Sequence, residues 1–379
     1  MTQARLETDY LIAGCGAVGM AFVDTLLTET DADIVMVDRR GKPGGHWNDA
    51  YPFVTLHQPS AFYGVASKEL GRGGKDQMGL NKGLLDLATG DEVCAYFDAV
   101  MRDRFLPSRR VRFFPMSEYL GDGRFKSLTS GAETEVSVRQ KFVDATFYTA
   151  SVPSTHTPNF TIAPGVWFEP LNALPRLKRA PEGYVVVGGG KTGIDAVLWL
   201  LQTGVDPDAI RWITPRDAWL LDRGNTQPGL EFFEQTMGAQ AARFETMASA
   251  PDLQSLFDGL EQVGYLTRID RAVRPSMFHA ATVSQLELEQ LRRVKNVIRL
   301  GRVSAIEADR IVLRDGEIPT SPDHLHVDCS ARPLERREHR PVFEPGRITV
   351  QMLRPYQPVF SASLIAHLET LFGDDDAKK

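Results

Sequence analysis

Apolar residues recur with two different periods along this chain. A continuous apolar run at residues 10–13 leads into a cluster of glycines, and apolar residues then recur at helical spacing over residues 17–27. A second apolar run, IVMV, ends at Asp38. Short apolar runs on both sides of a helical pattern are typical of parallel strands joined by a crossover helix. The first part of the chain therefore predicts a βαβ unit.

The same pattern returns in the middle of the chain. The run YVVV at residues 184–187 leads into a second glycine cluster and a helical pattern, and the next strand pattern, IRWIT, covers residues 210–214. Residues 151–183 are rich in proline, which fixes φ and removes a backbone donor, and we interpret them as the crossing between two domains. The glycine-rich segment 71–83 is expected to be an exposed excursion.

Helical spacing dominates residues 229–294, after which short strand patterns return and a last helix is expected beyond Pro358. These patterns predict an α/β fold with two Rossmann-like dinucleotide-binding domains and a helical insertion. The expected parts are a discontinuous FAD-binding domain of residues 1–150 plus 296–379, the proline-rich crossing at 151–183, and an NADPH-binding domain of residues 184–295 that carries the insertion at 229–294.

The first glycine cluster, GCGAVG, follows a strand pattern and opens a helix pattern. Gly14 permits the tight turn, Gly16 lets a pyrophosphate approach the backbone, and Gly19 lets the helix pack closely on the strand. Phosphates would face the helix N-terminus, whose free N–H groups favour anions. Asp38, at the end of the next strand, can accept hydrogen bonds from ribose. The motif predicts a dinucleotide site rather than an ordinary βα turn, with the residues Gly14, Gly16, Ala17, Gly19, Asp38 and Arg39.

The second glycine cluster, GGGKTG, has the same form. The strand after its helix ends at Thr214, Pro215 and Arg216 instead of at a carboxylate. A carboxylate would repel a 2′-phosphate, whereas a guanidinium can bind it with two hydrogen bonds. This cluster therefore predicts NADPH, although Arg216 could equally be a solvated loop charge. The predicted residues of the site are Gly188, Gly190, Lys191, Thr192, Gly193 and Arg216.

Two dinucleotide sites in one chain indicate that a nicotinamide passes a hydride to a tightly held flavin. We assign FAD to the first site, and the residues after Asp38 sharpen this assignment. The stretch DRRGKPGGHWNDAYP resembles class B flavin-dependent monooxygenases, the group of flavin-containing, Baeyer–Villiger and N-hydroxylating monooxygenases. The stretches VVVGGGKTGID, FVDATFYT and LHVDCSARP resemble the NADPH turn and the two inter-domain crossings of that group. The resemblance adds Gly45, His46 and Trp47 to the predicted flavin site.

Membership in this group implies an FAD-dependent, NADPH-consuming monooxygenase that inserts one oxygen atom of O2 into a small organic substrate through a flavin C4a-(hydro)peroxide. Two alternatives stay open. One is an NADPH-dependent flavoprotein reductase or oxidase without oxygen insertion, and the other is a non-catalytic protein that uses the flavoprotein scaffold for binding. The last alternative rests on Phe147 and Ala331, which stand in the two crossings where the group usually has glycine.

The stretch YPFVTLHQPSAFYG, at residues 51–64, contains the candidate catalytic residues. Here His57 and Gln58 could hydrogen-bond the edge of the isoalloxazine ring or the substrate. The alternative for His57 is a loop or core histidine with a backbone partner. Tyr356 and Gln357 precede the last predicted helix, whose N-terminal dipole can stabilise negative charge on a flavin.

Composition narrows the class of protein. A chain of 379 residues with 42% hydrophobic residues suffices for two domains, and a net charge of −6 disfavours nucleic acid as a partner. No signal-peptide or membrane-spanning pattern occurs, so no membrane partner and a cytoplasmic location are expected. The three cysteines form no CxxC pair and the histidines lack partners at metal-ligand spacing, so neither a redox dithiol nor a metal site is expected. The substrate and the oligomeric state are left open.

Overall fold

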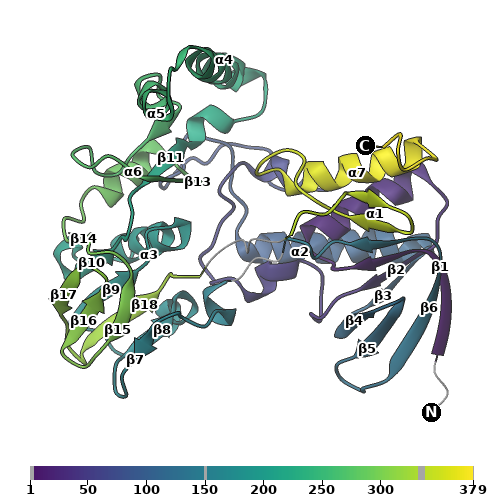
Figure 1. The fold of residues 1–379 in the computed structure, drawn as a ribbon, viewed down its shortest axis with the longest axis horizontal. Coiled ribbons are helices and arrows are strands. Elements are labelled where there is room, and N and C mark those ends of the chain that lie inside the picture. Colours follow the sequence, from purple (N-terminus) through teal and green to yellow (C-terminus); the bar gives the residue numbers. More distant parts are fainter. Residues whose placement is uncertain (1–3, 149–151, 332–337, 379) are drawn as a thin grey trace.

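The computed structural model describes residues 4–148, 152–331 and 338–378. Two lobes lie side by side, and each is built around a sheet whose central strands are parallel (Figure 1). The predicted α/β class is confirmed, because both glycine clusters lie between a parallel strand and a helix.

The first sheet has the strand order β19-β20-β6-β1-β2-β3, and strands β20, β6, β1, β2 and β3 are parallel. Strands β4 and β5 extend it in antiparallel fashion beside β6. Strand β1 begins earlier than the apolar run at residues 10–13, because it pairs with β6 along its length. The strands are β1 (Ala4–Ala13), β2 (Ile34–Val37), β3 (Val111–Phe114), β4 (Ser117–Gly121), β5 (Arg124–Ser127), β6 (Glu133–Asp144), β19 (Phe343–Glu344) and β20 (Arg347–Thr349).

Three helices complete the first lobe: α1 (Ala17–Glu29), α2 (Gly90–Val100) and α7 (Pro358–Leu371). Helices α1 and α7 pack against each other above the sheet (Figure 1). Phe22 of α1, Phe97 of α2 and Ile365 of α7 are fully buried in one apolar cluster. The last helix expected from the sequence is therefore confirmed, and it belongs to the core of the first lobe.

The second sheet has the parallel order β14-β10-β9-β18-β8. Helices α3 and α6 cover one of its faces, and a four-stranded sheet, β17-β16-β15-β7, covers the other. The elements are β7 (Thr161–Ile162), β8 (Phe168–Pro170), β9 (Gly183–Val187), α3 (Lys191–Gln202), β10 (Ile210–Ile213), α6 (Gln285–Leu291), β14 (Val297–Ile298), β15 (Val303–Ile306), β16 (Arg310–Leu313), β17 (Gly316–Pro319) and β18 (His324–Asp328).

The strand pairing corrects one expectation about the chain. Strands β14 and β18 lie in the segment 296–379, which the sequence predicted to complete the first domain. They pair with β10 and β9 of the second sheet instead. Among the described strands of this segment, only β19 and β20 return to the first sheet. Short apolar strands carry no information about which of two parallel sheets they join, and the contacts between sheets decided this pairing.

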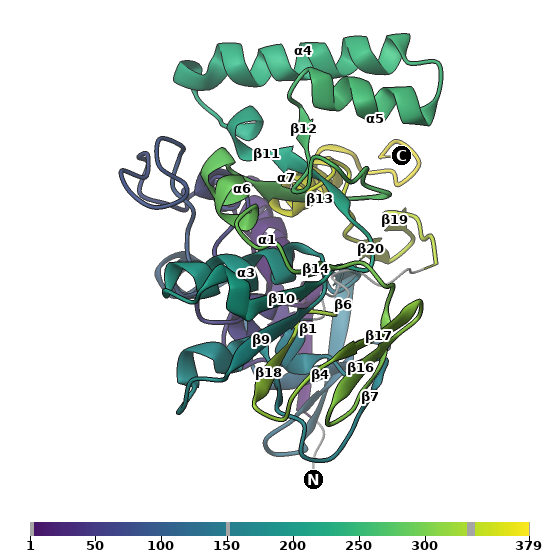
Figure 2. The ribbon, with the colours of Figure 1, turned by 90° about the vertical axis from the view of Figure 1, so that its left-hand side faces the viewer.

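The insertion at residues 229–294 is partly different from the prediction. It contains helices α4 (Phe233–Ser249), α5 (Leu253–Gln262) and α6, and α4 and α5 form the outermost layer of the molecule (Figure 2). It also contributes strands β12 (Leu266–Thr267) and β13 (Met277–Val283), which pair with β11 (Ala218–Asp222). Strands β12 and β13 thus form because they can hydrogen-bond to β11, although their sequences show no clear strand periodicity.

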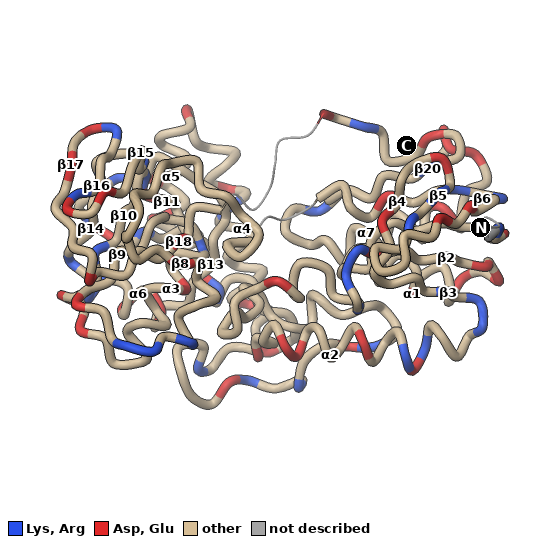
Figure 3. The backbone as a smooth tube through the Cα atoms, turned by 90° about the horizontal axis from the view of Figure 1, so that it is seen from below, with Lys and Arg blue, Asp and Glu red and all other residues tan. Residues whose placement is uncertain are grey.

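The glycine-rich excursion at residues 71–83 is exposed around Gly73 and Gly74, as predicted. Its far end, however, docks on the second lobe, where Asn81 accepts a hydrogen bond from Arg223 (3.1 Å) and the carbonyl of Leu80 accepts one from Ser284. The expectation of an exposed excursion was therefore wrong for Leu80 and Asn81, whereas Lys82 and Gly83 are exposed as predicted. Figure 3 shows acidic and basic residues intermixed over both lobes. Within the described part of the chain, no helix is long and apolar enough to cross a membrane.

Candidate functional site

The two glycine turns have nearly the same geometry. Gly14 and Gly188 have φ values of +98° and +137°, which disfavour any residue with a side chain. The residue before each helix is extended, with φ −74° and ψ −177° at Gly16 and φ −86° and ψ −174° at Gly190. Both backbones therefore leave the N–H groups of the following helix free to meet an anion.

The third glycine of each turn is required by close packing. A Cβ atom added to Gly19 would lie 1.9 Å from the carbonyl oxygen of Gly14, and one added to Gly193 would lie 2.0 Å from that of Gly188. The helix can approach the turn only because these side chains are absent. This is the role that the sequence assigned to the third glycine.

The second glycines of the two turns have different surroundings. A Cβ at Gly190 would meet nothing within 4 Å, so this backbone borders open space. A Cβ at Gly16 would lie 3.4 Å from the Cα of Gly45. The GGHW segment therefore lies directly against the first turn, although the two are far apart in the sequence, and the two predicted parts of the flavin site meet.

Asp38 ties the first turn to the end of β2. Its Oδ2 accepts a hydrogen bond from the backbone N–H of Cys15 (2.6 Å), and its Oδ1 accepts one from that of Arg40 (2.8 Å). A carboxylate has further acceptor capacity, so ribose hydroxyls can still bind it. The predicted neighbour Arg39 is different, because its exposed side chain lies 3.7 Å from Glu118 at the surface.

The two crossings share a contact pattern that sequence reasoning missed. Asp144 accepts hydrogen bonds from the backbone N–H and the hydroxyl of Thr146 (2.9 and 2.7 Å). Asp328 accepts the equivalent pair from Ser330 (2.9 and 2.6 Å). Each crossing also closes on its own glycine turn, since a Cβ at Gly14 would lie 2.9 Å from the Thr146 methyl group. The available signal was the repeated Asp-x-Thr/Ser in DAT and DCS.

The GGHW segment forms the short helix η1 (Gly45–Asp49). The indole Nε1–H of Trp47 donates to the hydroxyl of Tyr63 (2.9 Å), and the His46 ring stacks on Trp47 with ring centroids 5.3 Å apart. Burial, and to a smaller extent the nearby Arg40, lower the pKa of His46 from 6.5 to about 4, against the opposing effect of Asp49. His46 is therefore neutral at neutral pH.

The neutral ring of His46 predicts a pH-dependent stability. Because the folded pKa is below the unfolded value, the contribution is complete above pH 6.5 and is lost as the pH falls from 6.5 through about 4. Between about pH 7.5 and pH 4, wild type is expected to lose up to about 3 kcal/mol more unfolding free energy than His46→Asn, at ~1.4 kcal/mol per pKa unit. Urea unfolding at both pH values measures this difference, and equal losses would contradict it.

Gln58 lies where the start of α7 meets the first lobe. Its Nε2–H donates to the carbonyl of Tyr356 (2.7 Å), and its Oε1 accepts a hydrogen bond from Gln357 (3.0 Å). The structure therefore brings together the predicted Gln58, Tyr356 and Gln357. Both ends of the Gln58 amide are engaged by the loop before α7.

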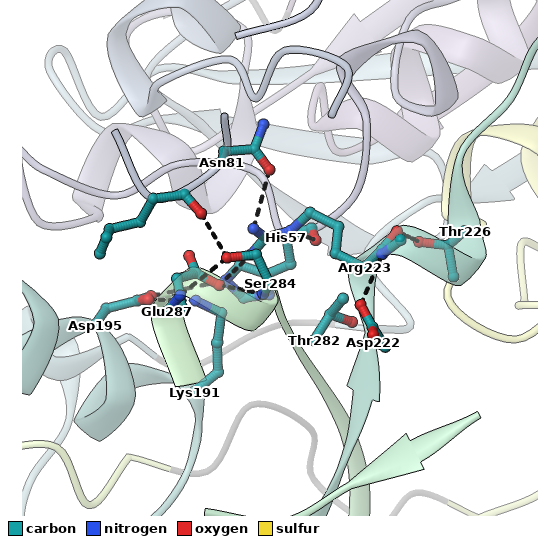
Figure 4. A network of polar contacts seen from close by, with 12 residues as sticks. His57, Asn81, Lys191, Asp195, Asp222, Arg223, Thr226, Thr282, Ser284 and Glu287 are labelled. Carbon is teal, nitrogen blue, oxygen red and sulfur yellow. Dashed lines mark hydrogen bonds and ion pairs between the residues drawn. The ribbon is translucent and has the colours of Figure 1, made fainter. Parts of the chain in front are cut away.

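His57 lies between the two lobes (Figure 4). Its carbonyl accepts a hydrogen bond from Arg223 Nε (3.0 Å), and its Nε2 lies 3.8 Å from Asp195 Oδ2. Its side chain is 43% exposed. Burial by the surrounding protein holds the pKa of His57 well below 6.5, and the positive charges of Lys191 and Arg223 lower it further. The sequence left open that His57 is a loop or core histidine with a backbone partner. Its backbone does have such a partner, Arg223, but its ring lies near the Asp195 carboxylate.

A cavity of about 500 Å³ lies beside the second turn. Gly189 and Thr214 line it, and the Thr214 hydroxyl is a buried oxygen without a hydrogen-bond partner among the described residues. Four cationic residues that sequence reasoning missed also line the cavity: Arg271, Arg292, Lys295 and Arg299. Their positions in the insertion and after it carried no motif. The predicted Arg216 is exposed and is not among the lining residues.

The cavity cations are not equally available to a ligand. Arg299 is paired with Asp217 and Asp270, at 2.8 and 3.0 Å. Arg292 donates to the carbonyls of Ile269 and Arg268 (both 2.9 Å). Arg271, by contrast, is exposed and makes no hydrogen bond or ion pair with any residue that the structure describes. The cavity therefore combines an unpaired guanidinium with an orphaned hydroxyl.

The fold is that of flavin-dependent monooxygenases. It resembles a flavin-containing monooxygenase from Stenotrophomonas maltophilia (TM-score 0.55, 13% identity, covering 96% of this chain and 97% of that one). It also resembles a cyclohexanone-bound cyclohexanone monooxygenase (0.59, 14%, 97% and 86%) and a steroid monooxygenase bound to NADP (0.55, 14%, 96% and 84%). No family model matches the sequence.

Sequence relatives define the family more narrowly. The chain is 51% identical over 373 residues to "Uncharacterized protein Rv2000" of Mycobacterium tuberculosis and to "Uncharacterized protein Mb2023" of Mycobacterium bovis. The alignment covers 98% of this chain and 69% of each relative. The chain belongs to the family of these mycobacterial proteins.

Proposed function

We propose that the chain is an FAD-dependent, NADPH-consuming monooxygenase that acts on a small organic substrate with O2. The observation that carries the proposal is the pair of matching glycine turns, one closed by the GGHW segment and the other beside a cationic cavity. The first sheet, with strands from both parts of the chain, would form the FAD-binding domain. The second sheet, with its insertion, would form the NADPH-binding domain.

The residues of the first turn would hold the flavin nucleotide. The free N–H groups at the start of α1 would bind its diphosphate beside the contact between Gly16 and Gly45, and Asp38 would bind its ribose. His46, Trp47 and His57 would surround the ring, and a neutral His57 can accept a proton there. Once bound, the flavin would supply hydride acceptance and oxygen activation.

The residues of the second turn would hold NADPH. Gly188, Gly190 and Gly193 shape the diphosphate site, while Lys191 and Thr192 open helix α3. The adjacent cavity is large enough for an adenosine phosphate, since small-ligand sites span roughly 300–1,000 Å³. Arg271 and the Thr214 hydroxyl would bind the 2′-phosphate, and Arg216 stays a further candidate ligand because it follows Thr214 closely.

The purified protein tests the proposal directly. We expect it to retain flavin and to consume NADPH in an oxygen-dependent reaction that a substrate stimulates with little peroxide release. If NADPH consumption releases stoichiometric peroxide with every compound tested, the protein would be an oxidase. If NADPH is consumed without oxygen, the protein would be a reductase. Failure to bind added FAD would refute the proposal and leave a non-catalytic scaffold.

The cavity cations predict which residue distinguishes NADPH from NADH. Replacing Arg271 by alanine is expected to raise the KM for NADPH roughly 10-fold, because a hydrogen bond to a charged group contributes about 1.5–3 kcal/mol. The KM for NADH should change less than about twofold, since NADH lacks the 2′-phosphate. Arg216→Ala is the matched variant outside the cavity lining. A larger effect of Arg216→Ala would assign the phosphate to Arg216 instead.

A further inference from the structure

Asp195, on helix α3, connects three segments of the molecule. Its Oδ2 accepts a hydrogen bond from the hydroxyl of Tyr51 (2.6 Å), and its Oδ1 is paired with Lys191 one helical turn earlier. The same Oδ2 lies 3.8 Å from His57 Nε2. The Asp195 side chain is only 14% exposed. A shielded carboxylate thus joins the loop at residues 51–57 to the helix that follows the second glycine turn (Figure 4).

We propose that Asp195 is a positioning residue for His57, which keeps the ring proton on Nε2 and leaves Nδ1 as the proton acceptor. The part of this inference that concerns turnover rests on the proposed function. Asp195 ends the stretch VVVGGGKTGID, but that motif gave no sign of its contacts with Tyr51 and His57, which come from a distant segment of the chain.

Burial by the surrounding protein is the main reason why the charged form of the His57 ring is disfavoured, and the charges around the ring add to this effect. Lys191 and Arg223 lie on different elements of the second lobe and disfavour the imidazolium, and Glu287 opposes them. His46 of the first lobe is itself neutral at neutral pH and therefore adds no charge next to His57. The ring is therefore neutral at neutral pH and carries one N–H. The 3.8 Å between Nε2 and the Asp195 carboxylate is longer than a hydrogen bond, so Asp195 favours the N–H on Nε2 through its negative charge.

Tyr51 and Lys191 hold the Asp195 side chain in place and still leave some of its oxygen lone pairs free to accept hydrogen bonds. Tyr51 stays protonated as a donor, because burial and the adjacent Asp195 hold its pKa well above 10. Tyr51 and Lys191 occupy one acceptor position on each oxygen, and an ionised carboxylate offers roughly four. A lone pair of Oδ2 is left for the His57 side. Lys191 belongs to the second glycine turn, so the same carboxylate also links His57 to the nucleotide site.

The test without turnover is the tautomer of His57, read from imidazole ¹⁵N chemical shifts at neutral pH in the full chain, with His57→Asn assigning the signals. Wild type is expected to show mainly the Nε2–H form, and Asp195→Asn to lose most of that preference. Tyr51→Phe, which removes a hydrogen bond but leaves the carboxylate, is expected to keep it. Asp195→Glu should restore it in part if Asp195→Asn folds poorly. An unchanged tautomer in Asp195→Asn would overturn the proposal.

Kinetics supply the second test. Asp195→Asn is expected to lower kcat at least 10-fold with a KM for NADPH within about threefold of wild type. The double variant Asp195→Asn with His57→Asn should have nearly the same kcat as His57→Asn alone, because Asp195 acts on turnover only through His57. Fully additive losses would contradict positioning. If wild type consumes no NADPH, the proposed function fails, while the tautomer experiment still decides the role of Asp195.

Discussion

Replacing Gly190 by valine is expected to weaken NADPH binding strongly while the protein still folds and binds flavin. The φ of −86° and ψ of −174° at Gly190 are open to any L-residue, and its added Cβ would meet nothing within 4 Å. Fold stability should therefore fall by only about 1 kcal/mol, the usual scale of a weaker N-cap. The side chain would fill the space that the turn leaves for a diphosphate. The KM for NADPH should rise roughly 100-fold, equivalent to about 3 kcal/mol.

A neighbouring glycine provides the control for this prediction. In Gly193→Ala the Cβ would lie 2.0 Å from the Gly188 carbonyl oxygen, so the helix itself must move. Thermal unfolding should show a clear loss of stability in Gly193→Ala and a small one in Gly190→Val. The KM for NADPH should rise in both variants. A Gly190→Val protein with the wild-type KM would show that no diphosphate binds over this turn.

Removing Arg223 is expected to cause the largest loss of stability. Its side chain is 1% exposed, and its guanidinium binds Glu287 (2.8 Å), the carbonyl of His57 and the side chain of Asn81. Arg223→Ala would leave the Glu287 carboxylate buried without its cation. Breaking one side of a buried pair costs about 3–5 kcal/mol. Urea unfolding at neutral pH measures this cost.

Two comparisons separate the charge from the packing. The double variant Arg223→Met with Glu287→Met removes both charges at similar volume and should recover most of the stability. Arg102→Ala removes an exposed partner of Asp98 and should cost less than about 1 kcal/mol. If Arg223→Ala lowers the unfolding free energy no more than Arg102→Ala does, the contacts of Arg223 with Glu287, His57 and Asn81 do not hold the two lobes together.

Some features of the molecule were predictable because they are local. The two glycine turns could be recognised because each role, the positive φ of Gly14 and the close packing of Gly19, concerns a few adjacent residues. The same holds for helix α7 and for the pairing of β1 with β2, which a short crossover dictates. The α/β class followed from these units.

Other features depend on contacts between distant parts of the chain. The sheet that β14 and β18 join was not predictable, and neither were the contacts of Asn81 with Arg223 and of Leu80 with Ser284. An apolar strand or a polar loop can satisfy several partners equally well. The cationic cavity likewise combines side chains from separate elements that carry no motif.

The sequence by itself determined where the chain must turn tightly and where helices α1 and α7 begin, since backbone conformation responds to neighbouring residues. The tertiary structure alone decided which side chains meet. Gly16 lies against Gly45 within the first lobe, and Asp195 lies against Tyr51 and His57 where the loop at residues 51–57 meets helix α3. The physical reason is that turn geometry is a short-range property of the backbone, whereas a site is a set of long-range distances set by the packing of whole elements.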